Sequence, residues 1–287
     1  MTLAACAAMP CSLPRILAIG GSDSCGGAGI QVDVKTGMAL GVEVSTAITA
    51  VTAQNTLGVQ KIAAISLAML TAQIDSVCQD TPPAVMKLGM LVDAARVQVV
   101  VDAICKYAPA GVVCDPILAS TSGRTLLDEN GRRTLIRLFP FMTLLTPNAQ
   151  EAAILSGRRA ETQTELFDAV HALQDQGASS VLLKGGHTGG NESADALFLL
   201  NQTSPLWFSA PRIETRNDHG TGCVLATAIA AFLARGSTLV EAVGCARKFV
   251  QQALARSASY HNGNGRGGML LVPVSNGSHS GFAGGYQ

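Results

Sequence analysis

The chain has 287 residues, 48% of them hydrophobic, and its 20 lysines and arginines balance 20 aspartates and glutamates. This length can bury a sizeable core, and we expect one large α/β domain rather than two small ones. The charges are scattered and sum to zero, so we expect no basic surface for nucleic acid or for an anionic membrane. The expected partner is a small molecule.

The cysteines indicate a reducing compartment. The chain has 8 cysteines and no Cys-x-x-Cys pair, which argues against zinc ligation and against a disulfide framework. Reduced thiols are typical of the cytosol. No uninterrupted apolar run approaches the roughly 20 residues of a membrane span. We therefore expect a cytoplasmic protein.

Both ends of the chain differ in composition from its middle. Residues 1–13 lack the basic region and the apolar segment of a signal peptide, and we expect a disordered extension there. After Tyr260 the chain is rich in Gly, Asn and Ser, a composition that buries too little apolar surface to stay ordered. The sequence therefore predicts a single domain over residues 14–260 and a Gly-, Ser- and Asn-rich tail over residues 261–287, whose last ~12 residues we expect to be loose.

Short apolar runs alternate with helical patterns between the two ends. The runs are short enough for buried strands, and they are Ile16–Ile19, Val85–Leu88, Val112–Cys114, Leu144–Thr146 and Val181–Leu183. The segment Thr46–Thr52 is rich in β-branched residues and adds a candidate strand. Helical patterns such as Ala94–Tyr107 and Glu161–Gln176 lie between the runs. This alternation predicts an α/β fold with a doubly wound parallel sheet.

A glycine-rich turn follows the first predicted strand. Gly26–Gly29 enters a helical pattern, and Asp33 lies one turn further, on the same side as Gly29. Glycine would let a substrate approach the backbone, and the Asp33 carboxylate would accept a hydrogen bond from it. Alternatively, Asp33 is an ordinary acid of the first helical turn. The spacing fits neither the dinucleotide fingerprint nor a P-loop.

Glycine or polar residues follow each of the buried runs. They are Gly20–Asp23, Gly89–Met90, Asp115–Pro116, Pro147–Asn148 with Glu151, and Lys184–His187. Because ligands of open α/β sheets bind outside the carboxyl ends of the strands, we expect these clusters to converge on one edge. Gln54 follows the β-branched segment, and its amide either binds a substrate ring with two hydrogen bonds or ends a strand in a polar turn.

Two of these clusters carry candidate ligands for phosphate and magnesium. Asn148 and Glu151 are one helical turn apart, and Mg²⁺ usually takes one or two protein carboxylates and keeps its waters. Asp115 is the other candidate carboxylate. Alternatively, Asn148 is a helix N-cap and Glu151 its capping partner. Lys184 either neutralises phosphate or only extends its charge to solvent.

The run His219–Cys223 stands directly before the apolar stretch Val224–Leu233 and is typical of a glycine turn that opens a helix. There the free N–H groups and the positive end of the helix dipole favour an anion. A helix N-terminus also lowers the pKa of a cysteine, so we expect a thiolate at Cys223. His219 and His187 are candidate donors to phosphate, or loop residues. The alternative for the whole turn is a set of small residues that fill a helix start.

Several segments, taken in order, carry a resemblance to a known family. They are Ile19–Asp23, Gly26–Asp33, Thr52–Thr56, Lys87–Leu91, Asp115–Pro116, Thr146–Ala152, Leu183–His187 and Asn217–Cys223. Together they resemble the hydroxymethylpyrimidine/phosphomethylpyrimidine kinases of thiamine biosynthesis, members of the ribokinase-like superfamily. The resemblance runs from about residue 15 to residue 258.

The resemblance implies a fold and an activity. The fold is a ribokinase-like three-layer sandwich with a central, mostly parallel sheet and helices on both faces. The implied reaction uses ATP and Mg²⁺ to phosphorylate 4-amino-5-hydroxymethyl-2-methylpyrimidine on its hydroxymethyl group and then to convert the monophosphate to the diphosphate. A homodimer is also implied.

The resemblance further implies a role for individual residues. Gly21, Ala28, Asp33, Gln54, Met90 and Ile117 would line the pyrimidine pocket, and Asp115 and Glu151 would hold the metal. Asn148, Lys184, Thr215, Asn217 and Arg247 would lie on the phosphate and ATP side. The N–H groups of Gly220, Thr221, Gly222 and Cys223 would hold the transferring phosphoryl group, and Cys223 would take or orient the hydroxyl proton.

Several positions depart from the family pattern, among them Ser24-Cys25, where the family has Pro-Ser, and two other functions stay open. Val224 and Ala226 replace a threonine and a serine near the turn, and Arg247 replaces a lysine. The nearest alternative is a pyridoxal kinase of the same fold, against which Gln54 in its Ala-Gln-Asn-Thr setting favours a pyrimidine. The other alternative is a catalytically silent ligand-binding regulator, for which Val224 and Ala226 are the only hints.

Overall fold

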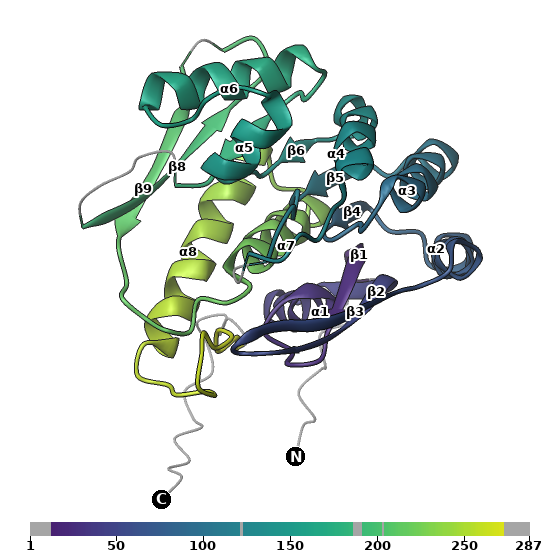
Figure 1. Ribbon diagram of the computed structural model, residues 1–287, viewed down its shortest axis with the longest axis horizontal. Coiled ribbons are helices and arrows are strands. Elements are labelled where there is room, and N and C mark those ends of the chain that lie inside the picture. Colours follow the sequence, from purple (N-terminus) through teal and green to yellow (C-terminus); the bar gives the residue numbers. More distant parts are fainter. Residues whose placement is uncertain (1–12, 121–122, 186–190, 203, 273–287) are drawn as a thin grey trace, which may run out of the picture.

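The computed structural model describes residues 13–120, 123–185, 191–202 and 204–272. Within these residues nine strands form one sheet in the order β3-β2-β1-β4-β5-β6-β7-β8-β9 (Figure 1). The strands are β1 (Arg15–Asp23), β2 (Glu43–Asn55), β3 (Gly58–Ala64), β4 (Val85–Leu88), β5 (Gly111–Cys114), β6 (Leu144–Leu145), β7 (Val181–Leu183), β8 (Glu192–Phe198) and β9 (Leu206–Pro211). The six strands from β2 to β7 are parallel, and β3, β8 and β9 pair antiparallel at the edges. The fold is therefore α/β with a mostly parallel sheet, as predicted.

Helices cover both faces of this sheet (Figure 1). They are α1 (Gly29–Leu40), α2 (Leu67–Asp80), α3 (Ala94–Tyr107), α4 (Glu129–Leu135), the 3₁₀ helix η1 (Ile136–Phe141), α5 (Ala149–Ser156), α6 (Gln163–Asp175), α7 (Thr221–Ala234) and α8 (Leu239–Ser257). Successive side chains of a strand point to opposite faces. Ile16 of β1 accordingly packs with α1, α7 and α8, whereas Leu17 and Ile19 pack with α2, α3, α5 and α6. Among the described residues no helix is long and apolar enough to cross a membrane.

The apolar runs of the sequence correspond to the central strands. The five runs correspond to β1, β4, β5, β6 and β7, and the β-branched segment lies in β2. The helical pattern Ala94–Tyr107 coincides with α3. The antiparallel strands β3, β8 and β9 were not predicted. Most of β3 and β9 is half-buried or exposed, and β8 carries Asp195 among its buried residues, so none of them shows a continuous apolar run.

The glycine-rich segment after α8 packs against the domain. We call Asn262–Leu271 the C-terminal strap. Arg266 N–H donates to the Thr56 carbonyl at 2.9 Å, and Met269 is 7% exposed within the core beside α7 and α8. The expectation from composition that the chain after Tyr260 does not stay ordered is therefore wrong over residues 261–272, because backbone hydrogen bonds and one apolar anchor hold a segment of low hydrophobicity. The predictions for residues 1–12 and 273–287 lie outside the described residues.

Candidate active site

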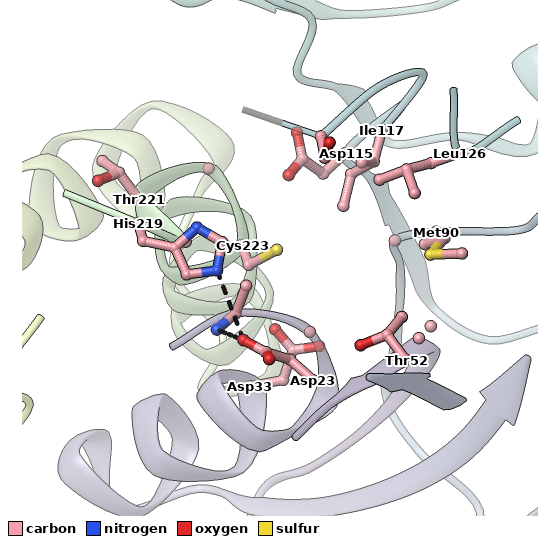
Figure 2. A pocket seen from close by; sticks show the side chains of 18 of the residues that line it. Asp23, Asp33, Thr52, Met90, Asp115, Ile117, Leu126, His219, Thr221 and Cys223 are labelled. Carbon is pink, nitrogen blue, oxygen red and sulfur yellow. Dashed lines mark hydrogen bonds and ion pairs between the residues drawn. The ribbon is translucent and has the colours of Figure 1, made fainter. Parts of the chain in front are cut away.

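A cavity of about 380 Å³ opens at the carboxyl ends of the parallel strands (Figure 2). The predicted clusters converge on it. Its walls include Gly20–Asp23 at the end of β1, Gly89 and Met90 after β4, Asp115 and Ile117 after β5, Asn148 and Glu151 at α5, Lys184 after β7, and Asp218–Cys223 at the start of α7. Residues from six separate parts of the chain therefore meet in one space.

The glycine turn before α7 closes one side of the cavity. Gly220 is the N-cap of α7 with φ of 79°, and a Cβ on it would lie 2.1 Å from the Gly27 carbonyl oxygen. Only glycine fits this close approach in a left-handed conformation. Thr221 N–H donates to the Asp218 carbonyl at 3.3 Å, so the predicted anion contact of Thr221 is wrong for its N–H. The anion contacts of the Gly220, Gly222 and Cys223 N–H groups remain predictions.

Lys184 faces this turn together with two carboxylates. Its Nζ lies 2.6 Å from Asp115 Oδ1 and 3.7 Å from Glu151 Oε2. A Cβ built on Gly222 would lie 3.0 Å from Asp115 Oδ2 and 3.3 Å from Lys184 Nζ, so the pair stands directly opposite the turn. We call Asp115, Glu151 and Lys184 the acid–lysine cluster.

Both interpretations of Asn148 and Glu151 have support in the geometry. Asn148 Oδ1 accepts from Glu151 N–H and Glu151 Oε2 accepts from Asn148 N–H, each at 2.8 Å, so the two form a capping box at α5. Both residues also line the cavity. The capping box fixes the Glu151 carboxylate beside Lys184 and Asp115.

The acid–lysine cluster has the donor chemistry of a magnesium site. Burial raises the pKa of Glu151, Lys184 opposes the shift, and the negative charge of Asp115 adds to it. Asp115 and Glu151 are two carboxylates beside a single ammonium, that of Lys184, so binding of a second cation between them is favourable. Magnesium sites beside phosphates commonly use one or two carboxylates and fill the remaining positions with water and phosphate oxygens. Asp115 and Glu151 therefore fit Mg²⁺.

Asp33 forms a buried ion pair with Lys87. Its carboxylate is fully buried and accepts from Lys87 Nζ through both oxygens at 2.9 Å, and Thr227 Oγ1 donates to Oδ1 at 2.6 Å. Burial by itself lowers the pKa of Lys87, but the Asp33 carboxylate outweighs it and raises that pKa. Asp33 lines the cavity, as predicted, but both of its oxygens accept from Lys87, so its acceptance of a hydrogen bond from the substrate stays a prediction. The pair supports the floor of the cavity.

Cys223 lies on the cavity wall as a thiol (Figure 2). It is 5% exposed, and burial raises its pKa to about 11, against the effect of nearby Lys87. The prediction of a thiolate in the free protein is wrong. The helix dipole favours the anion, but the desolvation of this site disfavours it more.

Other residues that line the cavity are suited to contact with an aromatic ring. Gly21, Ala28, Gln54, Met90 and Ile117 all line the cavity, as predicted from the resemblance. Met90 and Ile117 offer apolar contact, and a Cβ on Gly21 would lie 3.0 Å from Met90 Sδ, so only glycine leaves room for this sulfur. Gln54, near the end of β2, adds an amide.

Comparison with known protein families shows the family of this chain. A family described as phosphomethylpyrimidine kinase matches residues 23–268. The chain belongs to this family. A hydroxymethylpyrimidine/phosphomethylpyrimidine kinase of Rhizobium meliloti is 42% identical to this kinase over 253 residues, which cover 88% of this chain and 94% of the relative. Bifunctional thiamine biosynthesis enzymes of Geobacter sulfurreducens and Arabidopsis thaliana are 39% and 40% identical, and the chain spans about half of each.

Solved structures support the same fold. The phosphomethylpyrimidine kinase of Clostridium difficile aligns with a TM-score of 0.73 and 33% identity over 84% of this chain and 99% of its own. The pyridoxal kinase of Staphylococcus aureus in complex with AMP-PCP and pyridoxal aligns with a TM-score of 0.79 and 26% identity over 93% and 94%. The chain is a small-molecule kinase of the ribokinase-like fold, acts by phosphorylation in thiamine biosynthesis, and as a kinase uses ATP.

The predicted ATP-side residues of the kinase fall into two groups. Arg247 lines a neighbouring cavity of about 210 Å³ that shares Lys184, Thr221 and Gly222 with the first. Its guanidinium donates to Asp195 Oδ2 at 2.6 Å and to the Ser193 carbonyl at 2.7 Å. This second cavity extends the phosphate side of the site away from the ring side.

Thr215 and Asn217 line neither cavity. Asn217 Nδ2 donates to the Ser257 carbonyl at 2.8 Å and Thr215 Oγ1 donates to the same oxygen at 3.5 Å, so both hold the end of α8. Their contact with ATP remains a prediction. His187 lies outside the described residues.

The departures at Val224 and Ala226 do not alter the cavity wall. Both side chains are fully buried in the core cluster with α1 and α8, and neither lines the cavity. The loss of two hydroxyls is therefore a change of core packing in α7. This removes the only observation that favoured a silent regulator.

The sequence placed Lys87 and Asp23 in the expected segments but did not show the role of either side chain. Lys87 stands inside the apolar run Val85–Leu88, and a charged residue within a buried strand requires a counter-ion. Asp23 accepts N–H groups from Cys25, Gly27 and Ala28 and so holds the first glycine loop in place. An aspartate three residues before Gly26 was the available signal.

Proposed function

We propose that this kinase uses ATP and Mg²⁺ to phosphorylate the hydroxymethyl group of 4-amino-5-hydroxymethyl-2-methylpyrimidine and then the resulting monophosphate. The observation that carries the proposal is the composition of one cavity. Met90, Ile117 and Gln54 form a wall for a polar ring, and the α7 turn with Lys184 forms an anion-binding wall. An alcohol on the ring would therefore stand beside the phosphoryl group. The homodimer and the cytoplasmic location remain predictions.

Phosphoryl transfer depends on positioning and on stabilisation of charge more than on covalent chemistry. The N–H groups of Gly222 and Cys223 and the ammonium of Lys184 hold the oxygens of the transferring group. Asp115 and Glu151 would hold Mg²⁺, which would supply further positive charge to the phosphates. The Asp33–Lys87 pair keeps the cavity floor fixed. The thiolate form of Cys223, which its raised pKa makes the minor form at neutral pH, takes the proton of the alcohol.

An assay with three alcohols tests this function. We expect ATP-dependent phosphorylation of the aminopyrimidine alcohol, detected as its monophosphate and then its diphosphate by ³¹P NMR. Pyridoxal and a thiazole alcohol are measured in parallel at equal concentration. Faster phosphorylation of pyridoxal would favour the second candidate, which the alignment with the pyridoxal kinase of Staphylococcus aureus supports. Turnover of none of the three would contradict a kinase function.

Cys223→Ala should change how activity depends on pH. A proton acceptor with a pKa near 11 is active only as thiolate, so kcat/KM of the wild type should rise about tenfold per pH unit from neutral pH towards that value. The variant should lose this rise and at least about 10² in rate at high pH. Profiles measured between neutral pH and the limit of protein stability check this. A flat wild-type profile would remove Cys223 as the proton acceptor.

Gln54→Ala should weaken binding of the ring. We expect the Michaelis constant for the aminopyrimidine to rise about tenfold, since a lost hydrogen bond to a ligand costs on the order of 1.4 kcal/mol. The Michaelis constant for ATP should stay within about a factor of two of the wild-type value, because the ring side and the phosphate side are separate walls. Gln60→Ala, on the exposed side of β3, is the control. Equal increases for both substrates would contradict a ring-binding role.

A further inference from the structure

His219 faces the ring side of the cavity, whereas the sequence suggested a donor to phosphate. Its Nε2 lies 2.9 Å from Gln54 Nε2 and 3.4 Å from Asp23 Oδ2. Figure 2 shows the imidazole directed at Asp23, and all three residues line the cavity. His219 therefore contacts the one amide that we assign to the substrate ring.

The imidazole is held in a fixed place. A Cβ on Gly27 would lie 2.8 Å from His219 Cδ2, so the ring packs directly on this glycine. His219 N–H donates to the Gly267 carbonyl of the C-terminal strap at 3.0 Å. Asp23, 3% exposed, is fixed in turn by the N–H groups of its glycine loop. The distance from the His219 imidazole to Gln54 is thus set by three segments that lie far apart in the sequence.

The carboxylate of Asp23 favours a proton on His219 Nε2. Burial by itself raises the pKa of Asp23, but the hydrogen bond with His219 and those with the loop N–H groups outweigh it and lower that pKa. A negative charge beside Nε2 stabilises an N–H there and disfavours a bare lone pair. A protonated Nε2 can only donate.

A donor at Nε2 selects one orientation of the Gln54 amide. If the amide nitrogen faces the His219 imidazole, the N–H groups of the two side chains point at each other. The single hydroxyl hydrogen of Thr52 then has two acceptors, the Ser22 carbonyl at 3.0 Å and Gln54 Oε1 at 3.2 Å. A half-turn of the amide places its oxygen against Nε2–H and its nitrogen against the Thr52 oxygen. Thr52 then donates to Ser22 alone, and the Nε2–H of His219 is shared between the Gln54 oxygen and Asp23 Oδ2.

We propose that His219 is a positioning residue that fixes the orientation of the Gln54 amide and thereby selects the substrate ring. A fixed amide offers one oxygen and one N–H in a set order, which matches an amino group next to a ring nitrogen. An amide free to turn accepts the reverse order as well and discriminates less. The inference rests on the proposed function, because the ring is taken to be the aminopyrimidine.

Two substitutions test the inference through substrate binding. His219→Phe should raise the Michaelis constant for the aminopyrimidine about tenfold and leave that for ATP within about a factor of two. It should also reduce the preference for the aminopyrimidine over pyridoxal. His219→Gln places an amide near Asp23 and Gln54 and should restore most of the wild-type value. It also keeps the test valid if His219→Phe folds poorly.

A double-mutant cycle separates action through Gln54 from a general effect. In the Gln54→Ala background, His219→Phe should add less than about a factor of two to the Michaelis constant. His171→Phe is the matched control, because His171 also contacts a glutamine, Gln174 at 3.2 Å, but lies in α6 away from the cavity. This control should leave both Michaelis constants unchanged.

The outcomes distinguish the inference from the function on which it rests. If the wild type phosphorylates the aminopyrimidine and His219→Phe leaves its Michaelis constant unchanged, the inference fails alone. Fully additive effects of His219→Phe and Gln54→Ala would also overturn it. If the wild type does not phosphorylate the aminopyrimidine at all, the proposed function fails instead.

Discussion

Replacing Asp33 by alanine is expected to lower the free energy of unfolding by about 3–5 kcal/mol, as is typical when one partner of a buried ion pair is removed. Lys87 is 1% exposed and directs its ammonium at the Asp33 carboxylate. Without Asp33 this charge is left inside the protein with no counter-ion of comparable geometry. Lys87→Met should cost less, because the carboxylate that remains can take up a proton.

Urea unfolding of Asp33→Ala and of two control variants measures this effect. Glu43→Ala breaks the exposed ion pair with Arg15 and should cost at most about 1 kcal/mol. The double variant Asp33→Leu with Lys87→Met removes both charges and should be more stable than Asp33→Ala. A cost below about 1 kcal/mol for Asp33→Ala would show that the pair does not stabilise the cavity floor.

The central strands could be predicted because both of their faces are buried. Ile16–Ile19 and Val85–Leu88 are nearly continuous apolar runs, as parallel strands between two helix layers require. The antiparallel edge β9 carries half-buried and exposed residues, and its place depends on pairing with β8. Such pairing is a tertiary contact that no local pattern displays.

The position of the site could be predicted, but the state of its groups could not. Asp115, Glu151 and Lys184 meet because strand ends share one edge, which is a rule of topology. Asp33 lies in α1, and its partner Lys87 lies 54 residues further along the chain, in β4. The thiolate prediction for Cys223 considered only the helix start, whereas the protonation state follows from burial by the surrounding chain.

Gly222→Ala is expected to abolish most of the kinase activity while the protein stays folded. The added methyl group would point at Asp115 Oδ2 and Lys184 Nζ, 3.0 and 3.3 Å away. It therefore fills the space between the α7 turn and the acid–lysine cluster, where we place the transferring phosphoryl group. Loss of such a preorganised site costs about 10²–10³ in kcat. Stability should be kept or raised, because alanine is favoured over glycine inside a helix by up to about 1 kcal/mol.

Gly244→Ala is the matched control for this substitution. Gly244 lies within α8, and a Cβ there would meet only Phe208 at an ordinary distance of 3.5 Å. It lines neither of the two cavities. The same gain in helix propensity is therefore expected without a change in the site.

The most direct test of the proposed path of the phosphoryl group is a single-turnover measurement. It compares the rate of phosphoryl transfer from ATP to the aminopyrimidine alcohol in wild type, Gly222→Ala and Gly244→Ala at matched thermal stability. We predict that Gly222→Ala lowers the rate by a factor of about 10² or more and that Gly244→Ala keeps the wild-type rate. Equal rates in all three proteins would contradict the claim that the phosphoryl group passes between the α7 turn and the acid–lysine cluster.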